Sequence, residues 1–219
     1  MFLLDPTGRL FHNAPMDTPM DAPMDAQVFD PARRRWSPAA TPAGAEEVSA
    51  EAALTWLQRR SGFPERAPVG LIGPNEAPEP VLRAARAAGA LLGRVGLTLL
   101  CGGREGVMEA GCHGAHEAGG LAIALLPGDD PADANPYASV VMATGIGEAR
   151  NALIAQSGAC LVAAGDSYGT LSEVALGLRM GKRVIGLTGA AQVEGVWHVG
   201  DTNALAEALA TVLLGLPSA

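Results

Sequence analysis

The sequence predicts an α/β protein organised around a doubly wound parallel sheet of about six or seven strands, in three layers. From residue 69 onward, short runs of continuously apolar residues alternate with segments of helical periodicity, which is typical of parallel strands covered by helices on both faces. Aromatic residues make up only 4% of the chain, whereas its 28 glycines suit close packing of helices on a sheet. Because crossovers between parallel strands are right-handed, few other topologies fit this order.

The first 48 residues differ from the rest and are expected to form a short N-terminal extension. The tetrad Asp5-Pro6-Thr7-Gly8 predicts a turn between two short apolar arms, and residues 27–31 add another short strand. Between them, Pro-Met-Asp repeats within residues 15–25, and prolines at this spacing are incompatible with a helix or a central strand. A partner-binding linear motif is the alternative, but an extended loop is the simpler interpretation.

Residues 49–219 are expected to form one domain that binds a nucleotide or another phosphate-bearing ligand. It begins with a helix over residues 49–60, which ends at Ser61-Gly62. Further helices are predicted from residue 78 or 80 to 92 and at 105–118, 147–156, 171–180 and 202–213, the last with Asp201 or Thr202 as its cap. Strands are predicted at 69–73, 97–101, 121–125, 140–142, 159–162 and 183–187.

The charge balance and the cysteines limit the partners and the compartment. The net charge is −8, so no overall basic field attracts nucleic acid, and the run Arg33-Arg34-Arg35 is interpreted as a solvated strand end. The three cysteines lie in apolar elements, as buried thiols of a reducing compartment do. The apolar start Met1-Phe2-Leu3-Leu4 is too short for a signal peptide, and no run approaches the roughly 20 apolar residues of a membrane span. We therefore expect a cytoplasmic protein that binds neither nucleic acid nor membranes.

In a doubly wound sheet, ligands bind beyond the carboxyl ends of the strands, near the point where the strand order reverses. Two loops there carry glycines, the one at Gly73-Pro74-Asn75 and the turn Gly102-Gly103-Arg104-Glu105-Gly106, which leads into Met108 and Glu109. The turn is neither a Walker A loop nor a dinucleotide fingerprint. By itself it is as compatible with tight packing as with a ligand cradle.

A second glycine turn makes the ligand interpretation stronger. Gly165-Asp166-Ser167-Tyr168-Gly169-Thr170 follows an apolar strand and runs into a helix that carries Glu173. Such a junction directs unpaired N–H groups at the helix N-terminus toward a phosphate or a carboxylate. Recurrence of the turn on neighbouring strands favours a site for a phosphate-bearing small molecule, with Glu173 as the acidic group beside it.

Gly145-x-Gly147-Glu148-Ala149-Arg150-Asn151 supplies a cation at the same edge of the sheet. An arginine in the first turn of a helix opposes the helix dipole, which a bound anion or a partner carboxylate would explain. The alternative is an exposed Arg150 paired with Glu148.

Cys112, His113 and His116 lie on one helix without further ligands, so we predict no metal site. Ser167 and Ser172 have no plausible histidine base, which argues against a serine hydrolase.

Three motifs resemble a known superfamily over residues 69 to about 187. They are Gly102-Gly103-x-x-Gly106-x-Met108-Glu109-Ala110, Glu148-Ala149-Arg150-Asn151 and Gly165-x-x-x-Gly169-Thr170-x-x-Glu173. Together they are similar to motifs of a Rossmann-like group that contains the Lonely Guy-type nucleoside-monophosphate phosphoribohydrolases, often labelled lysine decarboxylases, and the molybdenum cofactor carrier proteins. The similarity is greatest to the small bacterial carrier-like members.

The resemblance implies roles for individual residues. In the hydrolases, the glycines and threonine of the Pro-Gly-Gly-x-Gly-Thr-x-x-Glu motif hold the 5′-phosphate, which assigns that task to Gly169 and Thr170 here. Arg150 and Glu173 would serve cleavage of the N-glycosidic bond. This sequence departs from the motif at Ala164, in place of the proline, and at Asp166, in place of a glycine. The aspartate either points away from the ligand or accompanies a different ligand, because an anion about 4 Å away would repel a phosphate by about 1–4 kcal/mol.

Three functional hypotheses follow. The first is a binding or carrier protein for a nucleotide or a molybdenum cofactor-like pterin, and the second is a nucleoside 5′-monophosphate phosphoribohydrolase. The third is an interaction protein whose extension recruits partners. Asp166 favours the first, whereas Arg150 and Glu173 keep the second open. The resemblance also implies a homodimer or a higher homo-oligomer.

Overall fold

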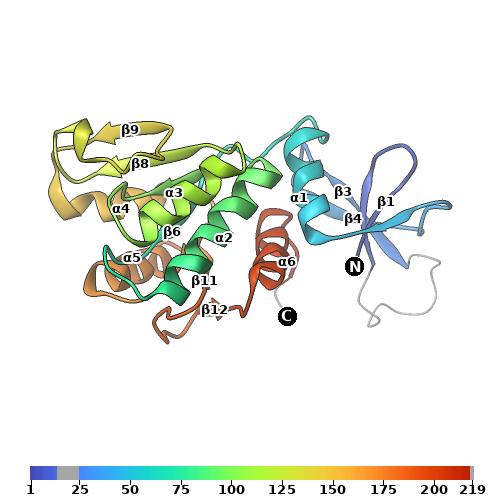
Figure 1. Cartoon of the computed structure of the whole chain (residues 1–219). Coiled ribbons are helices and arrows are strands. Elements are labelled where there is room, and N and C mark those ends of the chain that lie inside the picture. The colour runs from blue at the N-terminus through green and yellow to red at the C-terminus, as the bar shows by residue number, and fades with distance from the viewer. Residues whose placement is uncertain (14–24, 218–219) are drawn as a thin grey trace. The chain divides into compact units, whose positions relative to one another are not determined.

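The computed structural model describes residues 1–13 and 25–217, which form two compact units (Figure 1). Unit 1 combines Met1–Glu65 with the C-terminal segment from Leu209, and unit 2 is Arg66–Ala208. The division therefore falls at residue 65 rather than at the expected residue 48. Except for Asp25, the Pro-Met-Asp repeat lies outside the described residues.

Unit 1 contains a five-stranded antiparallel sheet in the order β4-β3-β2-β1-β5. The expected turn at Asp5 joins the first two strands, and its carboxylate accepts hydrogen bonds from the backbone N–H groups of Thr7 and Arg9 at 3.0 and 2.8 Å. The arginine run lies at the start of β4. The strands are β1 (Phe2–Leu4), β2 (Leu10–Asn13), β3 (Ala26–Asp30), β4 (Arg35–Ala39) and β5 (Glu46–Val48).

Helix α1 (Ala50–Arg59) groups with this sheet and not with the following domain. Its N-cap is Ser49, whose hydroxyl accepts a hydrogen bond from the N–H of Ala52 at 3.1 Å. The indole N–H of Trp56 donates to the carbonyl of Gly8 at 2.7 Å, which ties the helix to the β1–β2 turn. Such long-range contacts are not visible in sequence periodicity, and they explain why the boundary lies after the helix.

Unit 2 contains a seven-stranded parallel sheet in the order β12-β11-β10-β6-β7-β8-β9. The chain runs outward from the central strand β6 to β9 and then returns to β10 on the other side of β6, so the predicted doubly wound sheet is confirmed. The seventh strand, β12, is short and only partly buried, and it has no long apolar run that would predict it. The strands are β6 (Val69–Ile72), β7 (Leu99–Cys101), β8 (Ala122–Leu126), β9 (Val140–Ala143), β10 (Leu161–Ala163), β11 (Val184–Gly186) and β12 (Val196–His198).

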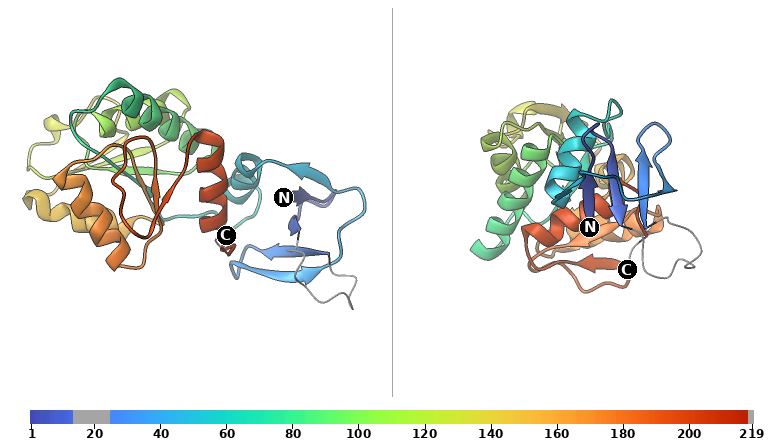
Figure 2. Two further views of the ribbon diagram at one scale, coloured as in Figure 1. Left: turned by 90° about the horizontal axis from the view of Figure 1, so that it is seen from below. Right: turned by 90° about the vertical axis from the view of Figure 1, so that its right-hand side faces the viewer.

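Helices cover both faces of this sheet, as the left view in Figure 2 shows. Helices α2 (Glu79–Val95) and α3 (Val107–Glu117) pack on one face, and α4 (Asn151–Ser157) and α5 (Tyr168–Arg179) pack on the other. Helix α6 (Thr202–Leu213) closes the chain and is capped by the Asp201 carboxylate, which accepts from the N–H of Ala204 at 2.8 Å. The loop helices η1 (Pro131–Asp133) and η2 (Gly147–Arg150) are short 3₁₀ turns.

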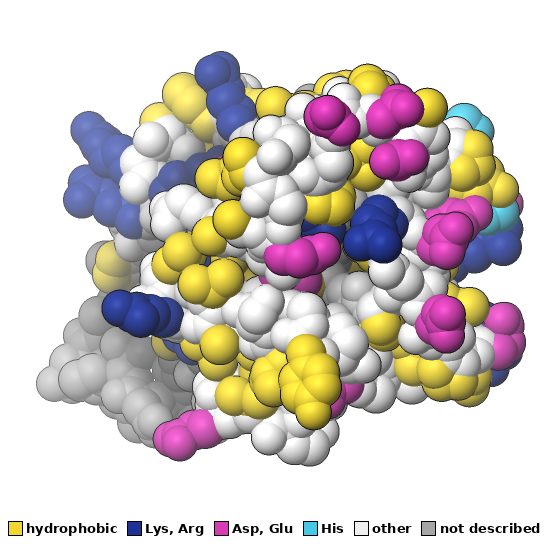
Figure 3. Space-filling model, turned by 90° about the vertical axis from the view of Figure 1, so that its left-hand side faces the viewer, with side chains coloured by type: hydrophobic (Ala, Val, Ile, Leu, Met, Phe, Trp, Pro, Cys, Tyr) yellow, Lys and Arg dark blue, Asp and Glu magenta, His cyan; other side chains and the backbone are white. Residues whose placement is uncertain are grey.

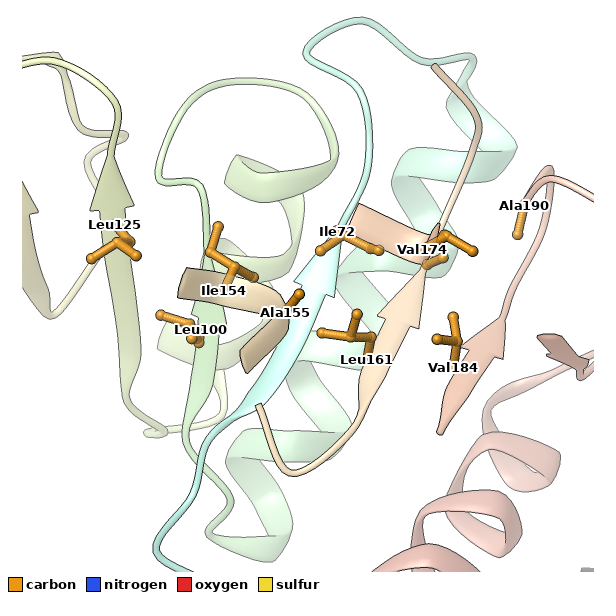
Figure 4. Close-up of a cluster of buried hydrophobic side chains, with 10 residues drawn as sticks. Ile72, Leu100, Leu125, Ile154, Ala155, Leu161, Val174, Val184 and Ala190 are labelled. Carbon is orange, nitrogen blue, oxygen red and sulfur yellow. The ribbon is translucent and has the colours of Figure 1, made fainter. Parts of the chain in front are cut away.

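One cluster of the core of unit 2 is aliphatic and lies between the sheet and the α4–α5 layer (Figure 4). Ile72, Leu161 and Val184 from neighbouring strands meet Ile154 and Val174 from the helices, and each of the five is at most 2% exposed. Burial of this kind stabilises by about 1.5–3 kcal/mol for each large aliphatic side chain.

The α2–α3 crossing depends on glycines. A Cβ at Gly89 of α2 would collide with the carbonyl of Gly111 in α3, and one at Gly114 would collide with the carbonyl of Arg86. The close packing of helices on the sheet that the glycine content predicts is present at Gly111 of α3, where a Cβ would collide with the Leu71 side chain of β6. None of the described helices is both long enough and apolar enough to cross a lipid bilayer.

Candidate functional site

A cavity of about 500 Å³ lies at the carboxyl edge of the sheet, where the strand order reverses between β6 and β10. Its lining comes from the loops after β6, β7 and β10 and from the starts of α3, α4 and α5. This is the edge at which doubly wound folds bind ligands. The lining residues are Leu71, Ile72, Gly73, Pro74, Asn75, Gly102, Arg104, Met108, Glu148, Arg150, Asn151, Ser167, Tyr168, Gly169, Thr170, Ser172 and Glu173.

Arg150 is the buried cation of this cavity. It ends the 3₁₀ turn η2, immediately before α4, and is only 5% exposed. Its guanidinium lies against the backbone of Gly102, where any Cβ would collide with it. Its Nε atom has no hydrogen-bond partner among the described residues. The structure contradicts the alternative of an exposed Arg150 paired with Glu148.

Glu173 faces Arg150 from the second turn of α5. Its carboxylate oxygen lies 3.7 Å from the Arg150 Nη1 atom, beyond the length of a good hydrogen bond, and the residue is 6% exposed. Burial raises the pKa of Glu173 to about 7, the charge of Arg150 partly opposes this rise, and Glu148 adds to it. Near neutral pH this carboxyl can therefore either hold or release a proton.

The N-terminus of α5 offers donors to an anion. Ser167 is its N-cap, and the Ser167 hydroxyl accepts from the N–H of Thr170 at 3.1 Å and contacts the Thr170 hydroxyl at 2.9 Å. In the described structure, no acceptor pairs with the N–H groups of Tyr168 and Gly169. Two free backbone donors at a helix N-terminus favour a phosphate or a carboxylate.

Polar contacts around these groups fix the walls of the cavity. The Asn151 amide donates to the Ser172 hydroxyl at 3.2 Å, and that hydroxyl donates to the carbonyl of Gly169 at 2.7 Å, which links α4 to α5. Glu148 lies 3.7 Å from the Nη1 atom of Arg104, and both side chains are substantially exposed. Figure 3 shows that acidic and hydrophobic side chains are interspersed on the face that it presents, in keeping with the negative net charge.

Most of the residues selected from the sequence line this cavity, but three of the glycines do not. Gly103 and Gly106 adopt positive φ angles of 75° and 65°. A Cβ at Gly103 would meet Ala124, and one at Gly106 would collide with the backbone of Asn75. Gly165, with φ 70°, lies against Pro74. These three glycines permit close packing of the loops that carry the cavity walls.

Two of the acidic candidates, Asp166 and Glu109, also lie outside this lining. Asp166 is exposed and does not line the cavity, which favours the interpretation that its side chain points away from the ligand. Glu109 lines a neighbouring cavity of about 680 Å³, together with Glu105, Asp133 and Asn135. Arg104 lines both cavities, so the two are adjacent.

Several lining residues were not among those selected from the sequence. Tyr168 is 95% exposed at the first position of α5, and Asn75 and Ser172 approach from the β6 loop and from α5. The sequence did contain a signal for these residues, because Tyr168 and Ser172 lie inside the Gly165–Glu173 motif and Asn75 lies two residues after Gly73. Motif spacing by itself does not tell which of its variable positions face the ligand.

The histidines of α3 take part in packing. The His113 ring stacks on Tyr137, with centroids 4.0 Å apart and an angle of 8° between the planes, and its Nε2 lies 3.6 Å from a Glu117 carboxylate oxygen. Within residues 1–13 and 25–217, no group of three or more histidine, cysteine or acidic side chains is arranged to hold a metal ion.

This chain is similar in sequence to a described family and to an archaeal protein. A family model described as the SLOG cluster4 family matches residues 66–210. An uncharacterised protein of Archaeoglobus fulgidus is 41% identical over 128 residues, which cover 58% of this chain and 84% of that protein.

Solved structures with a similar fold include two proteins associated with molybdenum cofactor. The molybdenum cofactor binding protein of Rippkaea orientalis is 33% identical with a TM-score of 0.64, and the match covers 68% of this chain and 98% of that one. The molybdenum cofactor carrier protein of Chlamydomonas reinhardtii is 33% identical with a TM-score of 0.62, and the match covers 68% and 99% of the two chains.

Proposed function

This chain belongs to the SLOG cluster4 family, and from that premise we propose that it binds a phosphate-bearing small molecule as a carrier or binding protein. The favoured ligand is a molybdenum cofactor-like pterin, because the similar structures include a binding protein and a carrier protein for that cofactor. The ligand is cargo in this proposal, and the chain needs only to hold it and release it.

The observation that carries the proposal is that Arg150 is buried without a full set of hydrogen-bond partners. Arg150 is only 5% exposed, its Nε atom has no partner among the described residues, and its Nη1 atom lies 3.7 Å from the Glu173 carboxylate. A buried guanidinium in this state is costly unless an anion completes its hydrogen bonds. Tyr168 and Gly169, whose backbone N–H groups are free, line the same cavity. Together these donors suit the phosphate of the ligand, and Asn151 and Ser172 would orient the groups next to it.

A thermal-shift series tests this proposal, with inorganic phosphate, pyrophosphate, nucleoside monophosphates and molybdenum cofactor as probes. At a concentration of 100 Kd, a specific ligand stabilises by about 2.7 kcal/mol, which raises the melting temperature by about 5 °C or more. Arg150→Gln should weaken binding about tenfold or more, since a hydrogen bond to a charged group contributes about 1.5–3 kcal/mol.

Arg83→Gln is the matched control, because Arg83 is an exposed residue of α2 that pairs with Glu79 and does not line the cavity. Circular dichroism of both variants separates loss of binding from loss of folding. If none of the phosphate probes shifts the melting temperature of the wild-type protein, the proposed function is wrong.

The raised pKa of Glu173 favours a second candidate function, a nucleoside 5′-monophosphate phosphoribohydrolase. A carboxyl with a pKa of about 7 can act as a general acid or base at neutral pH, and its carboxylate form can stabilise the positive charge that builds on a sugar during N-glycosidic cleavage. In this candidate, Gly169, Thr170 and the α5 N–H groups hold the 5′-phosphate, and Arg150 and Glu173 serve the cleavage, with Glu173 activating water.

Chromatography for free base distinguishes the two functions. Wild-type protein is incubated with each nucleoside monophosphate, and Glu173→Gln is the test variant because it keeps the shape of the side chain but cannot exchange a proton. Base release that Glu173→Gln abolishes would contradict the pure carrier. Binding without base release in either protein would contradict the hydrolase.

We also expect a homo-oligomer and a cytoplasmic location. Ile146, Leu153 and Tyr168 lie at or close to the starts of η2, α4 and α5 and are 49%, 43% and 95% exposed, and exposed large apolar side chains favour a protein contact. Size-exclusion chromatography with light scattering measures the assembly, and a monomeric mass at micromolar concentration would contradict it.

A further inference from the structure

A pair of buried cysteines adjoins residues that line the two cavities and has no place in the proposed function. Cys101 ends strand β7 and Cys112 lies on α3, and their Sγ atoms are 3.4 Å apart. Both side chains are 0% exposed. A disulfide has a bond length of about 2.05 Å, so the sulfur atoms need to approach by only about 1.3 Å. We propose that Cys101 and Cys112 form a reversible disulfide on reaction with a peroxide, which makes them a redox modification site beside the ligand cavity.

The two sulfurs differ in their chemistry. The hydrogen bond from Cys101 and a contact from the Asn135 amide at 3.6 Å lower the pKa of Cys112, despite its burial. The same pairing and burial raise the pKa of Cys101. Cys112 is therefore the sulfur that loses its proton more readily, with the Cys101 thiol as the donor to it.

Asn135 connects the Cys112 sulfur to a neighbouring cavity. Asn135 contacts the Cys112 Sγ atom and also lines the cavity of about 680 Å³. A peroxide is much smaller than a disulfide reagent and is therefore the oxidant class that suits a sulfur buried beside this cavity. The oxidant class that we assign to this site is therefore hydrogen peroxide or a small organic peroxide.

The reaction balances with one equivalent of hydrogen peroxide. The Cys112 thiolate attacks a peroxide oxygen, the O–O bond breaks, and the departing hydroxide takes up a proton to form water, which leaves a sulfenic acid on Cys112. The Cys101 sulfur then attacks the Cys112 sulfur, an S–S bond forms, and the sulfenic oxygen leaves as a second water with the Cys101 proton. Two thiols are oxidised to one disulfide, and the peroxide is reduced to two water molecules.

The pair is directly connected to the floor of the ligand cavity. Cys101 precedes Gly102, against which the Arg150 guanidinium lies, and the N–H of Gly103 donates to the Cys101 sulfur at 3.4 Å. Movement of the Cys101 sulfur toward α3 alters this hydrogen bond. We therefore expect disulfide formation to change amide hydrogen exchange in the Gly102–Gly106 turn, whether or not the cavity binds a phosphate.

Peptide mapping tests the proposal on the chain of residues 1–219. The reduced protein is treated with hydrogen peroxide, quenched, denatured, alkylated and digested with trypsin. Cleavage at Arg94, Arg104 and Arg150 separates the two cysteines, so the expected product is peptide 95–104 linked to peptide 105–150, with only Cys160 alkylated. Dithiothreitol should restore all three alkylated cysteines, and Cys160→Ser should give the same linked peptide.

Two single variants test the order of the steps. Cys101→Ser should leave Cys112 as a sulfenic acid that progresses to a sulfinic acid, since no partner thiol remains. Cys112→Ser should leave Cys101 as a thiol at the same peroxide dose. Circular dichroism and thermal unfolding verify that both variants fold. Three alkylated cysteines after treatment of the wild-type protein, or a linked peptide without altered exchange in the turn, would overturn the proposal.

Discussion

Replacing Glu173 by glutamine should stabilise the folded protein at alkaline pH. Burial raises the pKa of this carboxyl from an ordinary value of 4.5 to about 7, even beside Arg150. Because one pKa unit corresponds to about 1.4 kcal/mol, ionised Glu173 costs the folded state about 3 kcal/mol relative to its protonated form. Glutamine has nearly the same shape as the protonated acid and carries no charge at any pH.

The sign of the effect follows from proton binding. Well below pH 4.5 the carboxyl is protonated in the folded and the unfolded chain, so the difference between its two pKa values does not change the free energy of unfolding. Between pH 4.5 and about 7 the folded protein binds more protons than the unfolded chain, so the unfolding free energy of the wild-type protein falls as the pH rises. The advantage of Glu173→Gln over wild type should therefore grow by about 3 kcal/mol between pH 4.5 and pH 8.

Urea unfolding at several pH values measures this difference. The fluorescence of Trp197 reports on unit 2 when Trp36→Phe and Trp56→Phe remove the indoles of unit 1. The exposed Glu105 provides a matched control, because Glu105→Gln makes the same chemical change at the surface. A stability difference between Glu173→Gln and wild type that does not vary with pH would refute the reasoning.

Three further predictions concern local geometry. Gly102→Ala should displace the guanidinium of Arg150 and weaken phosphate binding about tenfold or more with unchanged circular dichroism, and unchanged affinity in calorimetry would contradict the close contact. Burial by itself would raise the pKa of Asp5, but hydrogen bonds from Arg9 and Thr7 lower it to about 2. Asp5→Ala should therefore destabilise unit 1 by about 2 kcal/mol at pH 7. The difference in unfolding free energy from wild type should diminish as the pH falls from 4 to 2. If urea unfolding gives the same difference at every pH, the stabilising role of the ionised Asp5 is refuted. Gly89→Ala should lower the melting temperature of unit 2 by several degrees, because the new Cβ collides with the carbonyl of Gly111 and overpacking costs about 1–3 kcal/mol. An unchanged melting temperature would show that the α2–α3 crossing can open at little cost.

The sequence by itself determined the parallel sheet and the edge at which the candidate residues gather. Continuous apolar runs alternating with helical periods are local patterns, and parallel strands place all their carboxyl ends on one edge. Gly73, Gly102, Arg150 and Glu173 could therefore be assigned to one region before any contact between them was known.

Only the tertiary structure decided what each of these residues does there. From the motifs, Gly106 and Gly165 were predicted to contact the ligand. In the structure they pack against Asn75 and Pro74 of another loop. Likewise, the pKa of Glu173 depends on burial by segments far apart in the chain. Desolvation and steric contact arise between residues that folding brings together, and no periodicity along the chain encodes them.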